Sequence, residues 1–181
     1  MDARSEINSP ATKNRATAER TSERELVLTR TINGPARLVF EAFTKPELFK
    51  RWWVPKSFGV SLLSCEVDAR VGGSYRLVFA SGNDAGEPAA FFGKYLEVAP
   101  HSRLVWTNDE GDNGGTITTV TFEEKGGKTL LVLRDLYPSK EALDAAIASG
   151  TVMFSDASTA VMDETFDQLD ELLVSLSASA S

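Results

Sequence analysis

Six polar side chains fall within strand-like runs and are the candidates for acid–base chemistry: Arg76, Tyr95, Glu97, Asn108, Arg134 and Asp135. Such chemistry needs at least two titratable groups that face one another inside a pocket. Arg76 and Glu97 lie on predicted neighbouring strands, and a cross-strand ion pair on the solvent-facing side of the sheet is the favoured interpretation. For Asp135, at a strand end before Tyr137-Pro138, capping of a turn is favoured over catalysis.

A single cysteine and a single histidine restrict the metal and nucleophile chemistry of the chain. Cys65 lies in a strand-like run and is interpreted as a small, half-buried apolar residue rather than a reactive thiol. His101, in the turn APHSR, is interpreted as a solvated turn residue. Because no second histidine or cysteine accompanies them, we expect no metal site, and a lone turn histidine excludes a Ser/His/Asp triad. The sequence supports no named reaction, so no residue is assigned as catalytic and no cofactor is expected.

Composition and charge narrow the function classes further. The net charge of −7 argues against binding to nucleic acid or to an anionic membrane surface, since both require basic patches. No apolar run approaches the roughly 20 residues that span a bilayer, so no membrane insertion is expected. The first residues lack an apolar signal segment, and the lone cysteine fits a reducing compartment, so we expect a cytoplasmic protein.

The elements that must position these side chains begin after a polar leader. Residues 1–24 have no apolar period and are predicted to be disordered. The run ELVLTRTI alternates as a strand does, starting at Glu25. Pro35 then suits the first turn of a short helix, and a second short helix follows Thr44 and ends at Pro55.

The middle of the chain predicts a series of strands separated by glycine-rich or proline-containing turns. The predicted strands are residues 59–68, 73–81, 88–98, 102–109, 115–124 and 128–136. Short connections favour antiparallel pairing between neighbours. Most of these strands carry apolar residues on one face and Thr, Lys, Arg or Glu on the other, which is typical of a sheet with one buried face.

The C-terminal part has helical periodicity. A short helix is predicted over 139–150, and a long helix over about 157–176, with a disordered tail at 177–181. The long helix carries one apolar stripe: Met162, Phe166, Leu169, Leu173 and Leu176. Its acidic residues fall largely away from this stripe, and a solvated face is favoured over a docking surface. At about 30 Å, this helix is long enough to cross a strongly bent sheet.

Several strings in this order resemble a known family: ELFKRWWVP (47–55), EVDARVGG (66–73), GKYLEVAP (93–100), SRLVWT (102–107), YPSKEALDAAIASG (137–150) and MDETFDQLDELL (162–173). They are similar to the START-like (SRPBCC) superfamily, in its bacterial branch homologous to activator of heat-shock-protein-90 ATPase. The resemblance covers about residues 25–176. It departs from the family at the longer, more apolar link between Gly150 and Met162, which is expected to affect the mouth of the cavity.

The resemblance implies an α+β helix-grip fold in one domain, residues 25–176. A curved antiparallel sheet of about six to seven strands would wrap around the long C-terminal helix, with two short helices after the first strand. Members of the superfamily enclose an apolar cavity between helix and sheet. Some bind lipids, hormones or polyketides, a few cyclise or hydrolyse them, and the co-chaperone role belongs to eukaryotic relatives.

The aromatic residues exceed what one layer of sheet and helix needs, which is typical of a large pocket with few polar anchors. The residues expected to line the cavity are Trp53, Phe58, Arg76, Phe79, Phe92, Tyr95, Trp106, Phe122, Met162, Phe166 and Leu169. Plain core packing explains any single one equally well. Of the adjacent pair Trp52 and Trp53, one is expected in the core and the other at the cavity entrance, without indication of which.

Three functions compete at this level. The first is non-catalytic binding of a small apolar or aromatic ligand by a monomer or homodimer. The second is an enzyme of cyclase or hydrolase type on aromatic or polyketide substrates, which requires titratable groups converging inside the cavity. The third, a chaperone-associated stress adaptor, depends on analogy alone.

Overall fold

A computed structural model describes residues 15–80, 88–109, 115–149 and 156–179. The strands are β1 (Thr17–Arg20), β2 (Glu25–Ile32), β3 (Leu62–Val67), β4 (Ser74–Phe79), β5 (Ala89–Ala99), β6 (Arg103–Asn108), β7 (Thr116–Lys125) and β8 (Lys128–Leu136). The helices are α1 (Ala36–Thr44), α2 (Pro46–Phe49), α3 (Lys140–Ser149) and α4 (Asp156–Ser179), and a 3-10 turn spans Lys56–Phe58.

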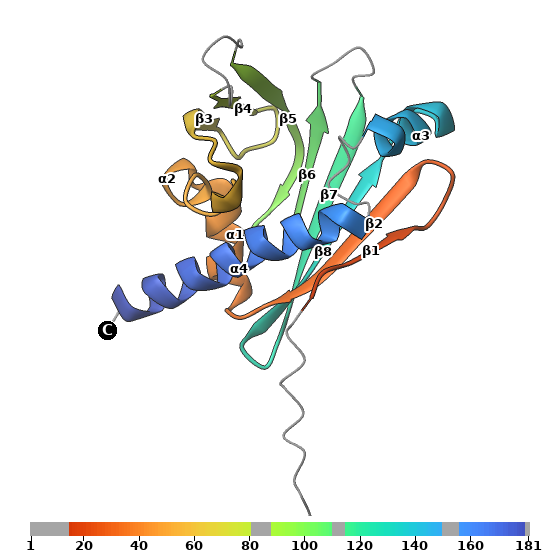
Figure 1. The fold of residues 1–181 in the computed structure, drawn as a ribbon. Helices are drawn as coiled ribbons and strands as arrows, with labels where there is room; N and C mark the ends of the chain where they lie inside the picture. The colour runs from red at the N-terminus through yellow and green to blue at the C-terminus, as the bar shows by residue number, and fades with distance from the viewer. Residues whose placement is uncertain (1–14, 81–87, 110–114, 150–155, 180–181) are drawn as a thin grey trace, which may run out of the picture.

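The strands form one antiparallel sheet in the order β1-β2-β8-β7-β6-β5-β4-β3. From β3 to β8 each strand pairs with the next one in the chain, as short turns favour. The sheet is strongly bent, and α4 crosses it from the β2 side towards α1 and α2 (Figure 1). This arrangement of an antiparallel sheet and a C-terminal helix confirms the helix-grip architecture.

Three details of the prediction are wrong. The sheet has eight strands rather than six or seven, because β1 forms within the segment expected to be disordered and pairs Thr17 with Thr29 of β2. The two short helices therefore follow the second strand. Helix α4 continues to Ser179, beyond its expected end at residue 176. The first part of the link, residues 151–155, lies outside the described residues, as do residues 1–14, and the rest of the link forms the start of α4.

The apolar stripe of α4 is the main contact between helix and sheet. Met162, Phe166, Leu169 and Leu173 are all buried, and Leu176 packs partly against the same core. Each fully buried side chain of this size contributes on the order of 2 kcal/mol of transfer free energy. The helical spacing of the sequence predicted this stripe.

The acidic face of α4 is neither simply solvated nor free for docking, because it surrounds a buried arginine of β2. Arg30 is 3% exposed. Its Nη1 donates to the backbone oxygen of Asp163 at 2.9 Å. Its Nη2 donates to Asp167 Oδ1 at 2.7 Å and to Asp170 Oδ2 at 3.1 Å. We call Arg30 with Asp163, Asp167 and Asp170 the arginine anchor, which ties α4 to the sheet.

Candidate functional site

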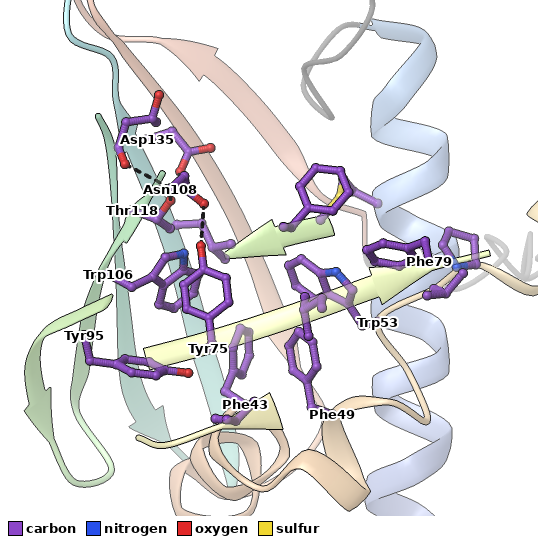
Figure 2. Close-up of a pocket in the computed structure, with 18 of the residues that line it drawn as sticks. Phe43, Phe49, Trp53, Tyr75, Phe79, Tyr95, Trp106, Asn108, Thr118 and Asp135 are labelled. Atoms are coloured by element: carbon purple, nitrogen blue, oxygen red, sulfur yellow. Dashed lines mark hydrogen bonds between the residues drawn. The ribbon is translucent and has the colours of Figure 1, made fainter. Parts of the chain in front are cut away.

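A pocket of about 490 Å³ lies between the bent sheet, the region of α1 and α2, and the first half of α4 (Figure 2). Its lining is Phe43, Phe49, Trp53, Val54, Pro55, Val60, Val67, Tyr75, Leu77, Phe79, Phe91, Tyr95, Trp106, Asn108, Thr116, Thr118, Leu133, Asp135, Tyr137 and Met162. Most of these side chains are aromatic or aliphatic. The polar ones gather on β6, β7 and β8, away from Phe79 and Trp53.

Strand alternation aims the wall residues into the pocket, because side chains two apart share a face. On β4 this face carries Tyr75, Leu77 and Phe79. On β8 and just beyond it, the face carries Leu133, Asp135 and Tyr137. The spacing is a local property of each strand, whereas the pocket arises where the bent sheet brings these faces together around one space.

A glycine on β5, Gly93, allows the Tyr75 ring and the backbone of Thr107 to pack closely against this strand. A Cβ atom on Gly93 would lie 1.8 Å from the Thr107 oxygen and 2.9 Å from the Tyr75 ring. Without a side chain, β5 admits both the neighbouring backbone and the Tyr75 ring. The Tyr75 hydroxyl then donates to the Thr107 carbonyl at 2.8 Å.

The segment after α2 supplies the pocket side opposite the polar strands. Trp52 is fully buried and donates from Nε1 to the Ala42 carbonyl at 2.9 Å, whereas Trp53 lines the pocket. Gln168 of α4 fixes the backbone of this segment through hydrogen bonds. Its Nε2 donates to the carbonyls of Trp52 at 3.1 Å and Val54 at 2.9 Å, and its Oε1 accepts from the Lys56 amide at 2.9 Å.

A chain of hydrogen bonds runs through the polar side of the pocket (Figure 2). The Tyr75 hydroxyl lies 3.1 Å from Asn108 Oδ1. Asn108 Nδ2 donates to Thr118 Oγ1 at 2.9 Å and to the Thr116 carbonyl at 3.1 Å. The Thr118 hydroxyl donates to Asp135 Oδ1 at 2.6 Å. We call Tyr75, Asn108, Thr118 and Asp135 the polar network.

Burial changes the acid–base properties of the groups at the end of this network. Removal from water raises the pKa of Asp135 to about 6, against the opposing effect of the Thr118 hydrogen bond. Burial, with a smaller effect of the nearby Asp135 charge, raises the pKa of Tyr137 to about 12. Burial also raises the pKa of Tyr95. At neutral pH the tyrosines are neutral and Asp135 is mostly ionised.

Five of the residues expected to line the cavity do so: Trp53, Phe79, Tyr95, Trp106 and Met162. Phe122, Phe166 and Leu169 lie in the solid core instead. Arg76 and Phe92 are exposed partners on the outer face of β4 and β5, so they do not line the pocket. Phe58 belongs to the 3-10 turn Lys56–Phe58, and its side chain lies outside the described part of the structure.

Two interpretations of polar residues are wrong. Arg76 does not pair with Glu97, because the pairing of β4 with β5 ends at Lys94 and Glu97 instead binds Arg103 at 3.1 Å. Asp135 does not cap a turn, because its carboxylate lies within β8 and accepts from Thr118.

Phe43, Phe49, Leu133 and Tyr137 also line the pocket, although they were not among the residues expected there. The alternation of Leu133, Asp135 and Tyr137 was a usable signal, because it aims Asp135 at the same face as an apolar residue. No comparable signal marks Phe43 and Phe49. Their helical positions become part of the pocket only where α1 and α2 meet the bent sheet.

The remaining chemical candidates lie away from the pocket. Cys65 is half-buried, burial raises the pKa of its thiol, and its Sγ lies 3.8 Å from the Pro46 carbonyl. His101 is exposed in its turn and meets the Phe40 ring edge-on at 5.6 Å. Among the described residues, no group of three or more His, Cys, Asp or Glu side chains is placed to hold a metal ion. Within the same residues, no helix is both long and apolar enough to cross a membrane.

Comparison with known proteins agrees with the geometry. The family model described as "Activator of Hsp90 ATPase homolog 1-like protein" matches residues 33–174. No curated protein matches the chain.

Solved structures of several bacterial proteins share the fold. A protein from Rhodobacter sphaeroides is 22% identical, with a TM-score of 0.74 over 89% of this chain and 99% of that one. A protein from Nitrosomonas europaea is 26% identical, with a TM-score of 0.69 over 87% and 98% of the two chains. A protein from Staphylococcus epidermidis, also 26% identical, has a TM-score of 0.69 over 88% and 94%.

Proposed function

The chain belongs to the family of activator of Hsp90 ATPase homolog 1-like proteins, an AHSA-type domain of the SRPBCC superfamily, and from this premise we propose that it binds a small, largely apolar molecule without converting it. The proposal rests on one observation. The pocket of about 490 Å³ is lined mainly by aromatic and aliphatic side chains, with its polar groups gathered on one side.

The size and lining of the pocket favour an occupant. Protein interiors normally pack without voids much larger than a water molecule. Pockets for small molecules span roughly 300–1,000 Å³ and combine apolar walls with a few placed polar groups. A volume of about 490 Å³ falls in this range. Filling it with an apolar molecule would remove the walls from water and add dispersion contacts with the rings.

An enzyme acting on aromatic or polyketide-type substrates is the second candidate, favoured by Asp135 and Tyr137 on one pocket wall. The burial that raises the pKa of Asp135 to about 6 suits a general base or acid. Two further candidates do not support this alternative, because Arg76 and Glu97 are exposed away from the pocket. Binding without conversion requires only the apolar pocket, whereas catalysis would also require titratable groups that converge inside it.

A pocket-filling substitution tests the proposed function. The probe is N-phenyl-1-naphthylamine, a weakly basic aromatic amine that is uncharged at neutral pH and fluoresces strongly in apolar surroundings. Leu133→Trp places a large ring in the pocket from β8 and should weaken probe binding at least about tenfold, which corresponds to about 1.4 kcal/mol. Titration of fluorescence against probe concentration measures the change.

Leu136→Trp is the matched control, because it makes the same change on the same strand, on a residue that is exposed and absent from the pocket lining. Its affinity for the probe should equal that of the unmodified protein. Circular dichroism must show that both variants fold. Equal binding by all three proteins, or no binding by the unmodified protein, would contradict the proposal.

A further inference from the structure

One group sets the charge of the pocket. Among the described residues that line it, Asp135 is the only one that is charged at neutral pH, and none is lysine, arginine or histidine. The other titratable groups in the pocket lining are the phenols Tyr75, Tyr95 and Tyr137. Asp135 has no ion-pair partner among the described residues. A carboxylate in apolar surroundings without a cation is unfavourable, because it loses hydration without compensation.

The polar network also fixes the role of Asp135 as a hydrogen-bond acceptor. Asn108 Nδ2 donates to Thr118 Oγ1, so the Thr118 hydroxyl hydrogen is directed to Asp135 Oδ1. The two Nδ2 hydrogens of Asn108 are used by Thr116 and Thr118. Asp135 Oδ2 receives no hydrogen bond from the described residues. The wall therefore presents a free acceptor with negative charge and no spare donor from this network.

From this geometry we infer that the occupant of the pocket is an apolar, aromatic-sized molecule with a protonated amine, which binds the Asp135 carboxylate. The inference rests on the proposed function and specifies its ligand class. The amine would donate to the free Oδ2 atom and supply the missing positive charge. The surrounding rings, which include Trp106 and Tyr75, also favour a cation over an anion, because their faces are electronegative.

Other head groups fit less well. A carboxylate or phosphate ligand would place a second negative charge beside Asp135 in surroundings that screen charge poorly. A neutral hydroxyl would satisfy the acceptor without offsetting the charge. Burial raises the pKa of Asp135 only to about 6, so the carboxylate is mostly ionised at pH 7.5 and a cation has the advantage.

Three probes with one ring system separate these cases: 1-naphthylmethylamine, 1-naphthalenemethanol and 1-naphthoic acid. Isothermal titration calorimetry at pH 7.5 measures each dissociation constant. We expect the amine to bind at least about tenfold more tightly than the alcohol, since hydrogen bonds between charged groups are the stronger ones. The acid should bind most weakly.

Asp135→Asn is the first test variant, because asparagine has nearly the same shape and keeps an oxygen for the Thr118 hydrogen bond. The preference for the amine over the alcohol should fall to less than about twofold, which corresponds to loss of the charge-assisted contact. Glu123→Gln, on an exposed residue of β7, is the matched control and should keep the preference. A preference that persists in Asp135→Asn would overturn the inference.

A pH series on the unmodified protein makes the test independent of any variant. The amine stays protonated from pH 7.5 to pH 5, and the phenols of Tyr95 and Tyr137, whose pKa burial raises, stay neutral. As the pH falls through about 6, Asp135 takes up a proton, and amine binding should weaken about fivefold to tenfold while alcohol binding stays constant. Amine binding that does not change over this range would overturn the inference.

The outcomes separate this inference from the proposed function. If all three probes bind with equal affinity, or the acid binds most tightly, the amine assignment is wrong and the apolar pocket still binds small molecules. If none of the three binds and N-phenyl-1-naphthylamine does not bind either, both the inference and the proposed function are wrong. Tight binding of the amine alone, lost in Asp135→Asn and at low pH, supports both.

Discussion

Two charges on paired strands, Arg30 and Asp135, have opposite surroundings. Arg30 of β2 contacts three carboxylates of α4, at 3.5 Å to Asp163, 2.7 Å to Asp167 and 3.1 Å to Asp170. Its guanidinium carbon also lies 5.6 Å from the centre of the Phe166 ring. Asp135 of β8 has one neutral donor, Thr118, and among the described residues no cation. β2 and β8 are neighbours in the sheet.

This difference separates a structural charge from one available to a ligand. The arginine anchor joins helix and sheet, and the Nε atom of Arg30 is the single buried side-chain nitrogen or oxygen without a hydrogen bond among the described residues. Asp135 faces a pocket, where an incoming molecule can supply what the protein does not. Removing each charge should therefore have opposite effects on stability, and only the removal of Asp135 should change which ligands bind.

The largest expected effect comes from breaking the arginine anchor. Arg30→Met keeps the apolar stem but removes the guanidinium that binds Asp163, Asp167 and Asp170. Loss of one partner of a buried ion pair costs about 3 kcal/mol or more of the free energy of unfolding. Urea denaturation followed by circular dichroism measures this loss.

Arg134→Met is the control for the arginine anchor, because Arg134 is an exposed arginine of β8 that lies 3.6 Å from Glu25. An exposed pair of this kind contributes less than about 1 kcal/mol. If the two arginine variants lose the same stability, the anchor is not what ties α4 to the sheet.

Removing the charge of Asp135 in the pocket should change the free energy of unfolding less than breaking the arginine anchor does, and in the opposite direction. Burial raises the Asp135 pKa from 3.8 in the unfolded chain to about 6, so ionisation of this group destabilises the folded state. Below pH 3.8 the penalty is absent, between 3.8 and 6 it grows, and above 6 it is complete. The free energy of unfolding of Asp135→Asn at pH 7.5 should therefore exceed that of the unmodified protein by about 2 kcal/mol, once the partial exposure of the side chain is allowed for. Urea denaturation measures this difference.

The pH dependence checks this sign. The stability advantage of Asp135→Asn should shrink as the pH is lowered from 6 to 4, because the unmodified protein then becomes protonated at the same position. Glu123→Gln, with its exposed side chain, should show no such advantage at any pH in this range. An Asp135→Asn variant that is less stable at pH 7.5 would show that the ionised carboxylate stabilises the fold, as Arg30 does.

The smallest expected effect comes from removing the hydrogen bond that Thr118 donates to Asp135, which leaves both Arg30 and Asp135 in place. Thr118→Val deletes the hydrogen bond that opposes the effect of burial on Asp135, so the pKa of Asp135 should rise above about 6. A carbon-13 NMR titration of the side-chain carboxyl measures the shift. Thr121→Val, a half-buried residue on the opposite face of β7, is the control and should leave the pKa unchanged. An unchanged pKa in Thr118→Val would mean that the polar network does not act on Asp135.

Local periodicity was sufficient to predict much of the fold. The 4, 3, 4, 3 spacing of the α4 stripe identified the buried face of that helix, because helical neighbours are three and four residues apart. Alternation and turn residues predicted the run of strands from β3 to β8. The same signals failed for β1, whose residues TAER have no apolar alternation and are held in place by pairing with β2.

The amino-acid sequence by itself determined the family and its helix-grip architecture, through strings that resemble known members, and the apolar side of most elements, through local spacing. Only the tertiary structure decided which of Trp52 and Trp53 lines the pocket, which acidic residues Arg30 binds, and that no cation of the described residues pairs with Asp135. These outcomes depend on distances between residues far apart in the chain. Such distances are set by the bend of the sheet and by where α4 crosses it.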